Sequence, residues 1–367
     1  MAGSSFDVVV VGAGIAGAGV AAGLGGGLRV ALLEAEDRPG YHTTGRSAAI
    51  FIQNYGNATI RALSRASAPL FDRAGAETPI LSQRGLLYVA GEEGLDAHAG
   101  LLADAEGMKP VTAGEALGLV PVLRPDWLAA AAYEPDAQDV DVAALHQAYV
   151  KRARSAGAEL VTNARLLAAR RSGGSWTIET TGGSFEAAVI VNAAGAWADV
   201  VAAACGVAPI GIRPLRRSIA VLPAPDGIDP RRWPLVADSA EGWYAKPEAG
   251  RLLVSPADED PVEPHDAFAD DMVLAEGLFR FEQAVDWPVT RVERSWAGLR
   301  SFAPDRTPIA GFDPAADGFF WLAGQGGYGI QTAPALSRFA SAAITRADPP
   351  DGLGALAAAL SPARFRS

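Results

Sequence analysis

The sequence contains a single cysteine and four histidines, and this scarcity narrows the chemistry open to it. Cys205 has no second cysteine to pair with, so an intrachain disulfide and a cysteine metal cluster are both excluded. The histidines are scattered without the spacing of metal ligands; they are His42, His98, His146 and His265. We therefore expect a protein without a bound metal.

An excess of lysine and arginine, as proteins with large basic clusters have, is also missing: Asp and Glu number 42 against 31 Lys and Arg, and the formal net charge is −11 at pH 7. Binding to phosphate-rich partners needs such clusters, so this charge argues against a nucleic acid or an acidic membrane surface as partner. Residues 8–28 are weakly apolar, but they are mostly Gly and Ala and fit a strand–turn–helix unit better than a membrane span. We expect a cytoplasmic protein with no integral membrane segment.

The length and composition of the chain are those of an ordinary globular protein. Its 367 residues are enough for two domains with separate hydrophobic cores. Hydrophobic residues make up 49% of the chain and charged residues 20%, and no internal repeat is present. Organisation must therefore be inferred from local motifs.

The most informative stretch is residues 7–36, DVVVVGAGIAGAGVAAGLGGGLRVALLEAE. An apolar run at 8–11 predicts a strand, and GAGIAG at 12–17 then matches G-x-G-x-x-G without interruption. An Ala-rich helical segment follows, and a second apolar run at 30–33 ends at Glu34. The pattern predicts a strand–turn–helix–strand unit that binds a dinucleotide.

The residue types of this unit suit a bound pyrophosphate. Gly12 permits the tight turn, Gly14 lets the backbone approach the phosphates, and Gly17 lets the helix pack closely on the sheet. The helix N-terminus supplies N–H groups and a positive dipole. The carboxylate of Glu34 can accept hydrogen bonds from an adenosine ribose. The alternative for the motif alone is a Gly-rich turn without a ligand.

Periodicity and turn residues predict further elements. Helices are expected at residues 58–73 after the cap Asn57, and at 142–155, 270–284 and 330–345. Strands are expected at 86–89, 165–170, 176–180, 184–186, 217–222, 243–246, 251–255, 292–299 and 318–323. The acidic stretch 91–96 is expected to be a solvated loop. From residue 211 to 300, strands with long connections indicate a second domain with a mixed or antiparallel sheet.

Three further stretches suit close contact with a cofactor. Residues 43–49 gather small and hydroxyl side chains around one arginine, which suits a phosphate and a flat ring; an ordinary surface loop is the alternative. An apolar strand from 188 runs into small residues up to 197. The Gly-rich loop 324–329 lies between a strand and a helix, so two distant parts of the chain are expected to embrace one ligand.

Five stretches together resemble the FAD-dependent D-amino-acid oxidase and dehydrogenase family over nearly the whole chain. They are GAGIAGAGVAAGL with Glu34, TTGRSAA at 43–49, NAAGAW at 192–197, WAGLRSFAPDRTPIAG at 296–311 and AGQGGYGIQTAP at 323–334. Within the family, the chain is most similar to bacterial D-arginine dehydrogenases, through PGYHTTGRSAA, PVLRPD, DVDVAALHQAYV, PLRRS, DPVEPHD and GGYGIQ.

The resemblance implies an α/β fold with a Rossmann-type FAD-binding domain and an α+β substrate domain with a mixed or antiparallel sheet. The FAD-binding domain would comprise residues 1–82, 141–210 and 305–367, and the substrate domain residues 83–140 and 211–304. FAD would be bound non-covalently. The sequence is consistent, because Cys205 lies just after NAAGAW and not in the late segment that sarcosine-oxidase relatives use for attachment.

Carried over by motif, the resemblance also implies the residues that contact FAD. The loop that opens the last helix would direct N–H groups at the N1/O2 edge of the flavin. The expected contacts are Gly12, Gly14, Ala16, Gly17, Glu34, Ala35, Thr43, Thr44, Gly45, Arg46, Ser47, Ala48, Ala49, Leu166, Gly326, Gly327, Tyr328, Gly329, Ile330 and Gln331.

The same resemblance implies hydride transfer from the substrate α-carbon to flavin N5, with oxygen or a quinone-type carrier as final acceptor. Arg217 and Arg300 match the arginines that bind the substrate carboxylate, for which the planar guanidinium is well suited. The hydroxyl of Tyr244 would add a further bond, and Tyr55 would lie on a loop that closes over the substrate. Read singly, each could be a surface arginine or a half-buried core tyrosine.

Two positions depart from the D-arginine enzymes. Ile50 replaces a histidine, and Leu86 replaces the glutamate that pairs with the substrate guanidinium. With Gly327 as a third wall residue, the substrate pocket is therefore expected to be apolar. We predict oxidative deamination of neutral, apolar D-amino acids. The alternatives are a secondary-amine oxidase of the sarcosine or glycine oxidase type, a non-catalytic flavin-binding protein, and, less favoured, a dehydrogenase that uses NAD alone.

Overall fold

The computed structural model describes residues 4–74 and 77–366, whose strands form three β-sheets. The first sheet has the order β10-β11-β12-β1-β2-β9, with β20 beside β12 and β19 beside β20. Its strands are β1 (Ser4–Val11), β2 (Val30–Leu33), β9 (Glu159–Val161), β10 (Leu166–Ser172), β11 (Ser175–Thr180), β12 (Gly183–Asn192), β19 (Ile309–Phe312) and β20 (Phe319–Ala323). The central strands β20, β12, β1, β2 and β9 run parallel.

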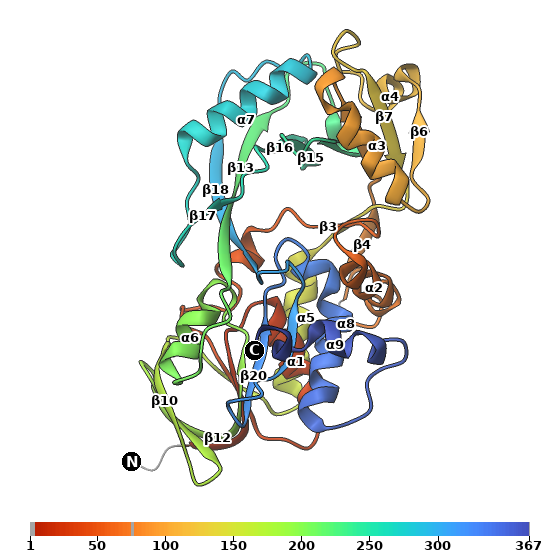
Figure 1. Cartoon of the computed structure of the whole chain (residues 1–367). Coiled ribbons are helices and arrows are strands. Elements are labelled where there is room, and N and C mark those ends of the chain that lie inside the picture. Colours follow the sequence, from red (N-terminus) through yellow and green to blue (C-terminus); the bar gives the residue numbers. More distant parts are fainter. Residues whose placement is uncertain (1–3, 75–76, 367) are drawn as a thin grey trace.

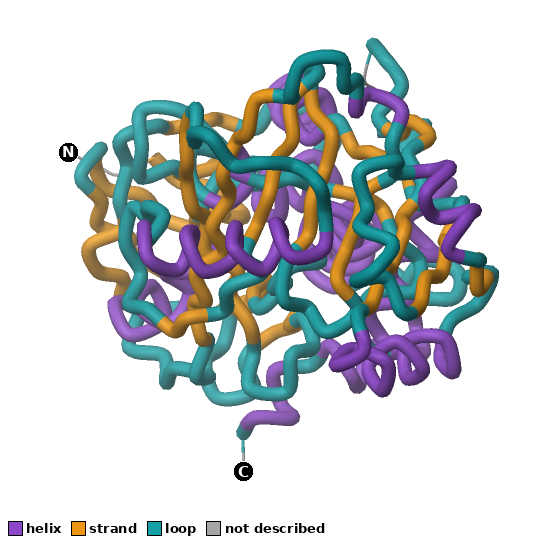
Figure 2. The backbone as a smooth tube through the Cα atoms, turned by 90° about the horizontal axis from the view of Figure 1, so that it is seen from above, coloured by secondary structure: helices purple, strands orange, loops and turns teal. Residues whose placement is uncertain are grey.

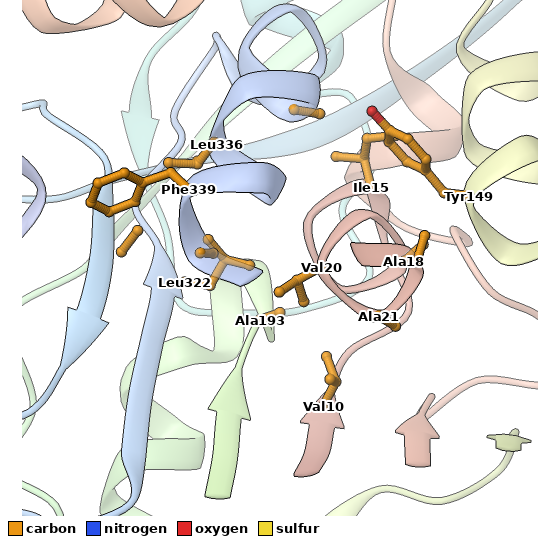
Figure 3. Close-up of a cluster of buried hydrophobic side chains, with 14 of the residues drawn as sticks. Val10, Ile15, Ala18, Val20, Ala21, Tyr149, Ala193, Leu322, Leu336 and Phe339 are labelled. Atoms are coloured by element: carbon orange, nitrogen blue, oxygen red, sulfur yellow. The ribbon is translucent and has the colours of Figure 1, made fainter. Parts of the chain in front are cut away.

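The side chains of the apolar strand β1 contribute to the hydrophobic core on both faces of the first sheet. Successive side chains point to opposite faces, so Val8 and Val10 pack in one cluster and Val9 and Val11 in another. Figure 3 shows Val10 in the first cluster, together with Val20 from one helix and Phe339 from another. The helices of that face are α1 (Ile15–Leu24), α5 (Val142–Ser155) and α8 (Gly329–Thr345), and α6 (Ala198–Ala204) covers the other.

The second sheet has the order β17-β13-β16-β15-β14-β5-β7-β6, with β18 beside β13. It is mixed, because β14 and β5 are parallel while their other neighbours are antiparallel. Its strands are β5 (Leu86–Ala90), β6 (Lys109–Val111), β7 (Ala130–Glu134), β13 (Arg213–Pro223), β14 (Leu235–Asp238), β15 (Tyr244–Glu248), β16 (Arg251–Ser255), β17 (Asp260–Pro261) and β18 (Arg294–Phe302).

Helices cover the outer side of this second sheet. Figure 1 shows α7 (Asp271–Ala284), α3 (Leu95–Asp104) and α4 (Ala113–Leu119) in the upper part of the molecule, away from α1, α5 and α8. In the view from above, a long helix crosses the strands (Figure 2). Trp243, Phe281 and Trp287 are at most 1% exposed in the core beneath α7. Side chains from sheet and helix thus exclude water together.

A third, small sheet lies where the two larger ones meet (Figure 1). It joins β3 (Ile50–Phe51), β8 (Gln138–Val140) and β4 (Leu81–Gln83) in that order, all antiparallel. Two remaining helices are α2 (Ala58–Ser67) and α9 (Ala357–Leu360). No helix in the described ranges is long and apolar enough to cross a membrane.

The α/β class expected from the sequence is confirmed, with corrections of detail. Asn57 caps α2 by accepting the Ile60 N–H at 3.1 Å, but the helix ends at Ser67 and continues as a 3₁₀ turn containing Pro69. The segments expected as separate strands at 184–186 and from 188 are one strand, β12. The solvated loop expected at 91–96 is wrong, because a 3₁₀ turn there leads into α3.

Candidate active site

The glycine turn after β1 has the geometry of a ligand cradle. Gly12 has φ +100°, and a Cβ there would lie 2.5 Å from the carbonyl oxygen of Ala193. A Cβ on Gly17 would lie 1.8 Å from the carbonyl oxygen of Gly12, so α1 and the turn are in direct contact. Larger residues would fill this space or push the elements apart, which is why the turn needs glycine.

Hydrogen bonds hold the turn in place from three sides. Glu34 accepts the N–H of Ala13 at 3.1 Å, and Thr44 Oγ1 accepts the N–H of Ile15 at 3.0 Å. His146, from α5, contacts the Ala13 carbonyl oxygen at 2.8 Å through Nε2. Because a carbonyl can only accept, Nε2 carries the proton and donates it. The turn is therefore organised by the protein itself.

A cavity of about 190 Å³ lies at the carboxyl end of β2. Glu34 lines it and is 8% exposed. Burial raises the pKa of Glu34, an effect partly offset by the N–H bonds that it accepts from Glu36 and Ala13. The remaining lone pairs of this carboxylate face the cavity, and binding of ribose hydroxyls by Glu34 stays a prediction.

The cavity beside Glu34 shares the wall residues Gly14, Thr43 and Thr44 with a second cavity of about 150 Å³, whose lining includes the predicted substrate arginines. Three buried polar atoms in the walls of this second cavity have no hydrogen-bond partner within the described residues: Arg217 Nε, Ser301 Oγ and Gln325 Nε2. Buried polar groups are normally paired, so these atoms indicate a polar ligand. The two adjoining cavities between Glu34 and the arginines, the glycine cradle and these atoms fit FAD.

The two arginines reach the site from adjacent strands. Arg217 lies on β13 and Arg300 on β18, and their register places Arg217 opposite Gly298 and Arg300 opposite Leu215. Arg217 is 8% exposed and donates to Glu259 at 3.1 Å through Nη2. Antiparallel pairing thus brings two distant guanidinium groups to one wall, where a carboxylate can bind both.

Two tyrosines complete this wall. The hydroxyl of Tyr55 lies 3.4 Å from Arg300 Nη1, and the Arg217 guanidinium lies 6.0 Å from the centre of the Tyr244 ring. Tyr55 also packs edge-on against Tyr328 at 4.8 Å between ring centres. Burial raises the pKa of Tyr328 to about 12, so its hydroxyl keeps its proton at neutral pH.

Beyond the arginines lies a chamber of about 320 Å³. Its wall includes the predicted pocket residues Ile50, Leu86 and Gly327. Tyr88 and Leu235 extend the apolar wall, because Leu86 and Tyr88 lie on one face of β5 and Leu235 is Leu86's neighbour on β14. The chamber has room for a substrate side chain, and its mainly apolar wall favours an apolar one.

Most polar side chains in the chamber wall already form hydrogen bonds within the protein. Arg61 donates to the carbonyl oxygens of Gly56 and Asp104. Asp238 accepts the N–H groups of Ala240 and Gly242. Glu241 is an exposed wall residue and adopts φ +58°.

Nearly all predicted cofactor residues line these three cavities. Those that do are Gly12, Gly14, Ala16, Glu34, Ala35, Thr43, Thr44, Arg46, Ser47, Ala48, Ala49, Leu166, Gly326, Gly327, Tyr328, Gly329, Ile330 and Gln331. Gly17 instead packs beneath the turn, and Gly45 lies behind it, donating its N–H to the Gly40 carbonyl at 2.9 Å. The side chain of Gln331 bonds to Ile52 and Ser64.

The sequence-based prediction did not include some residues that line the cofactor cavity, and it did not include the hydrogen bonds that hold others in place. Ser301 and Gln325 lie inside the motifs quoted above, so their signal was present but unused. Arg46 was expected at the cofactor, yet it also bonds to Asp266 and to the carbonyl oxygens of Ala267 and Ala297. It therefore ties the segment 43–49 to the second sheet.

Comparisons with known proteins agree with this geometry. A family model described as FAD dependent oxidoreductase (DAO) matches residues 7–343. Glycine oxidase of Geobacillus kaustophilus is 30% identical over 237 residues, which are 62% of this chain and 59% of the relative. Mitochondrial sarcosine dehydrogenase of Homo sapiens is 26% identical over 284 residues, which are 69% and 30% of the two chains. The chain thus spans less than two thirds of these curated relatives.

Solved structures share the architecture. The crystal structure of the Geobacillus kaustophilus glycine oxidase has a TM-score of 0.82 and 26% identity, covering 96% of this chain and 98% of that one. L-Proline dehydrogenase from P. horikoshii has a TM-score of 0.84 at 22% identity, covering 99% and 98%. L-α-Glycerophosphate oxidase from Mycoplasma pneumoniae, solved with FAD bound, has a TM-score of 0.82 at 18% identity, covering 93% and 95%. The last two likenesses show the fold alone.

Proposed function

The chain belongs to the DAO family of FAD-dependent oxidoreductases, and from that premise we propose that it oxidises the C–N bond of free, apolar D-amino acids. The observation that carries this proposal is the pair Arg217 and Arg300, which converge beside the cofactor cavity at the entrance of an apolar chamber. When bound, FAD supplies the two-electron acceptor for this reaction.

The protein residues bind and orient the amino acid. The two guanidinium groups hold its carboxylate, with the unpaired Arg217 Nε as one donor. Tyr244 and Tyr55 adjoin the same anion, and Tyr55 helps to exclude water above it. A carboxylate fixed in this way places the α-carbon at the boundary between the cofactor cavity and the chamber.

The reaction balances as a two-electron oxidation. The substrate loses its α-hydrogen with the bonding electron pair, and its amine loses a proton, which yields an imino acid. Water then hydrolyses the imino acid to a 2-oxo acid and ammonia. An acceptor of the oxygen or quinone class takes up the two electrons in the second half of the cycle.

The chamber wall supports an apolar side chain. A leucine- or methionine-sized group buried against Ile50 and Leu86 gains about 25 cal/mol per Å², or about 1.5–3 kcal/mol in all. A guanidinium in the same place loses hydration without a counter-charge from these two side chains. The motifs of this chain resemble those of D-arginine dehydrogenases, but for these reasons we propose a different substrate.

A second candidate is oxidation of a secondary amine or glycine. The observation in its favour is that similar relatives are a glycine oxidase and sarcosine dehydrogenases. Sarcosine and glycine have no side chain on the α-carbon, so they would leave the chamber of about 320 Å³ largely empty. The first proposal uses this space, and the second does not.

An anaerobic screen of the purified, FAD-loaded protein distinguishes these candidates. The panel contains D-leucine, D-methionine, D-phenylalanine, D-arginine, their L-enantiomers, sarcosine and glycine, and loss of the flavin's visible absorbance is followed. We expect the apolar D-amino acids to reduce the flavin fastest. Faster reduction by sarcosine or glycine would select the second candidate. No reduction by any compound would instead indicate a flavin-binding protein without this activity.

A further inference from the structure

Lys246 is a buried cation close to the cofactor cavity, and substrate binding as described above does not use it. It lies on β15 two residues after Tyr244. Its ammonium lies 3.1 Å from Asp139 Oδ1 and donates to the carbonyl oxygen of Ala49 at 3.3 Å. Only 8% of the side chain is exposed. A buried ammonium is retained where partners compensate for its lost hydration, so these two contacts define its place.

A second cation holds the other side of the same carboxylate. Arg84 contacts Asp139 Oδ2 through Nε at 2.7 Å and through Nη2 at 2.6 Å. Its Nη1 donates to the carbonyl oxygens of Arg231 and Trp233 at 2.8 and 2.9 Å. Two cations therefore share one carboxylate, and the network of Lys246, Asp139 and Arg84 carries one net positive charge.

This network lies behind a thin wall of the active site. Ser47 and Ala49 line the substrate chamber on one side and a separate outer cavity of about 600 Å³ on the other. Lys246 lines that outer cavity, and Ser47 also lines the cofactor cavity. One backbone segment, residues 47–50, thus separates the charge of Lys246 from the cofactor cavity and the substrate chamber.

The contact with Ala49 sets the direction of the next amide. In a trans peptide the C=O of Ala49 and the N–H of Ile50 point in opposite directions, so the N–H points away from Lys246. Further along, the N–H and C=O of Ile52 both bond to the side chain of Gln331, at 3.2 Å each. Backbone polar groups alternate in an extended segment, so the Ile50 N–H points to the same side as Gln331, toward the substrate chamber that both residues line.

We propose that Lys246 is a positioning residue for the flavin ring. It acts through Ala49, because holding this carbonyl from behind directs the Ile50 N–H into the chamber as a hydrogen-bond donor, on the side where the neighbouring Ser47 and Ala48 also line the cofactor cavity. The net charge of the network also favours the negative charge that arrives with a hydride, which brings two electrons and one proton. The inference rests on FAD binding in the proposed function and is independent of which amine is oxidised.

Three substitutions separate the donor from the charge. Lys246→Arg keeps both, Lys246→Gln keeps a donor without the charge, and Lys246→Met removes both. The control is Lys151→Met, because Lys151 is an exposed lysine, 70% exposed and paired with Glu77 at 3.1 Å. For each holoenzyme, the midpoint potential is measured by reductive titration against a reference dye, together with the visible absorption spectrum and the FAD dissociation constant.

We expect Lys246→Gln to lower the equilibrium constant for flavin reduction about tenfold, which is about 30 mV for a two-electron couple. Its spectrum and FAD affinity should remain those of the parent protein. Lys246→Met should show the same fall in potential, an altered spectrum and about tenfold weaker FAD binding. Lys246→Arg and the Lys151 control should match the parent protein.

A parent-like potential in Lys246→Gln, or a fall in Lys246→Arg as large as in Lys246→Met, would overturn the inference. If Lys246→Met does not retain FAD, the Gln and Arg variants still decide the matter. The titration contains no amine, so an error in the proposed substrate would leave its results unchanged. An error about Lys246 would equally leave the substrate screen unchanged.

Discussion

Replacing Gly327 by alanine should displace the guanidinium group that binds the substrate carboxylate. Gly327 has no positive φ, so its backbone accepts an alanine without strain. A Cβ at this position would lie 2.9 Å from Arg300 Nη1, 3.0 Å from Cζ and 3.2 Å from Nε. Ordinary contacts of this kind are about 3.4 Å or longer. The guanidinium must therefore move by about half an ångström.

A shift of this size disturbs hydrogen bonds whose strength depends on geometry. Arg300 Nη1 is already 3.4 Å from the Tyr55 hydroxyl, so this weak hydrogen bond has little strength to lose. The hydrogen bonds from Arg300 to the substrate carboxylate would be weakened the most. Loss of one hydrogen bond to a charged group costs about 1.5–3 kcal/mol. That corresponds to a fall of about 10- to 100-fold in kcat/KM, mostly through a higher KM.

The assay is steady-state kinetics with D-leucine, combined with the FAD dissociation constant. Because Gly327 and Arg300 also line the cofactor cavity, kcat/KM is measured at saturating FAD, so that any change in FAD binding is separated from the change in substrate binding. Gly118→Ala is the control, since a Cβ on Gly118 meets no atom within 4 Å. In an Arg300→Ala background, Gly327→Ala should have little further effect, because both changes act through one guanidinium. Parent-like kcat/KM in Gly327→Ala, or full additivity of the two changes, would refute this reasoning.

Four further predictions follow from the same site. Arg300→Ala and Arg217→Ala should each lower kcat/KM by about 10²–10⁴, about 3–5 kcal/mol, and near-parent kinetics in both would place the carboxylate elsewhere. Leu86→Glu should raise kcat/KM for D-arginine, which the parent enzyme should use at least about 10²-fold less well than D-leucine; no gain would contradict the apolar pocket. Acid-denatured protein should release all its flavin as FAD, whereas flavin in the pellet would indicate a covalent link. Burial lowers the pKa of His146 below its ordinary 6.5, so below pH 6.5 the unfolded chain binds more protons than the folded protein. The free energy of unfolding should therefore fall as the pH drops below 6.5, and it should fall less in His146→Gln. Calorimetry on both proteins over this pH range checks the difference.

Local patterns predicted the parts of the site that lie within one stretch of sequence. The turn after β1, its helix and Glu34 are encoded in residues 7–36, where a Cβ on Gly17 would meet the Gly12 carbonyl oxygen of the same stretch. The cap Asn57 was predictable for the same reason, since its partner is the Ile60 N–H three residues away. Such features depend on neighbours in sequence and need no knowledge of the tertiary fold.

The helix α3 was missed because its sequence carries little periodic signal. His98 is its only buried residue, while Leu95 is 38% exposed and the first turn is acidic. A helix that buries one polar side chain has no apolar stripe to recognise. Its position is set by tertiary contacts, among them the hydrogen bond between His98 Nδ1 and the Oγ of Ser239, the residue after β14, at 2.8 Å.

Contacts between distant strands were beyond the reach of local patterns. The resemblance named Arg217 and Arg300, but the register of β13 against β18 is what places them on one wall. The network of Lys246, Asp139 and Arg84 joins three parts of the chain and had no signature in any of them. Charged residues in strands and loops are usually solvated, so their burial becomes evident only in three dimensions.

The most direct test of the central claim compares D-leucine with D-leucinamide in anaerobic reduction of the bound flavin. Both compounds carry the same amine, α-hydrogen and side chain, and only the amino acid has the carboxylate for which Arg217 and Arg300 are proposed. We expect D-leucine to reduce the flavin at least about 10²-fold more efficiently than the amide, as for loss of one partner from a buried charge pair. Equal efficiency with the two compounds would contradict the account.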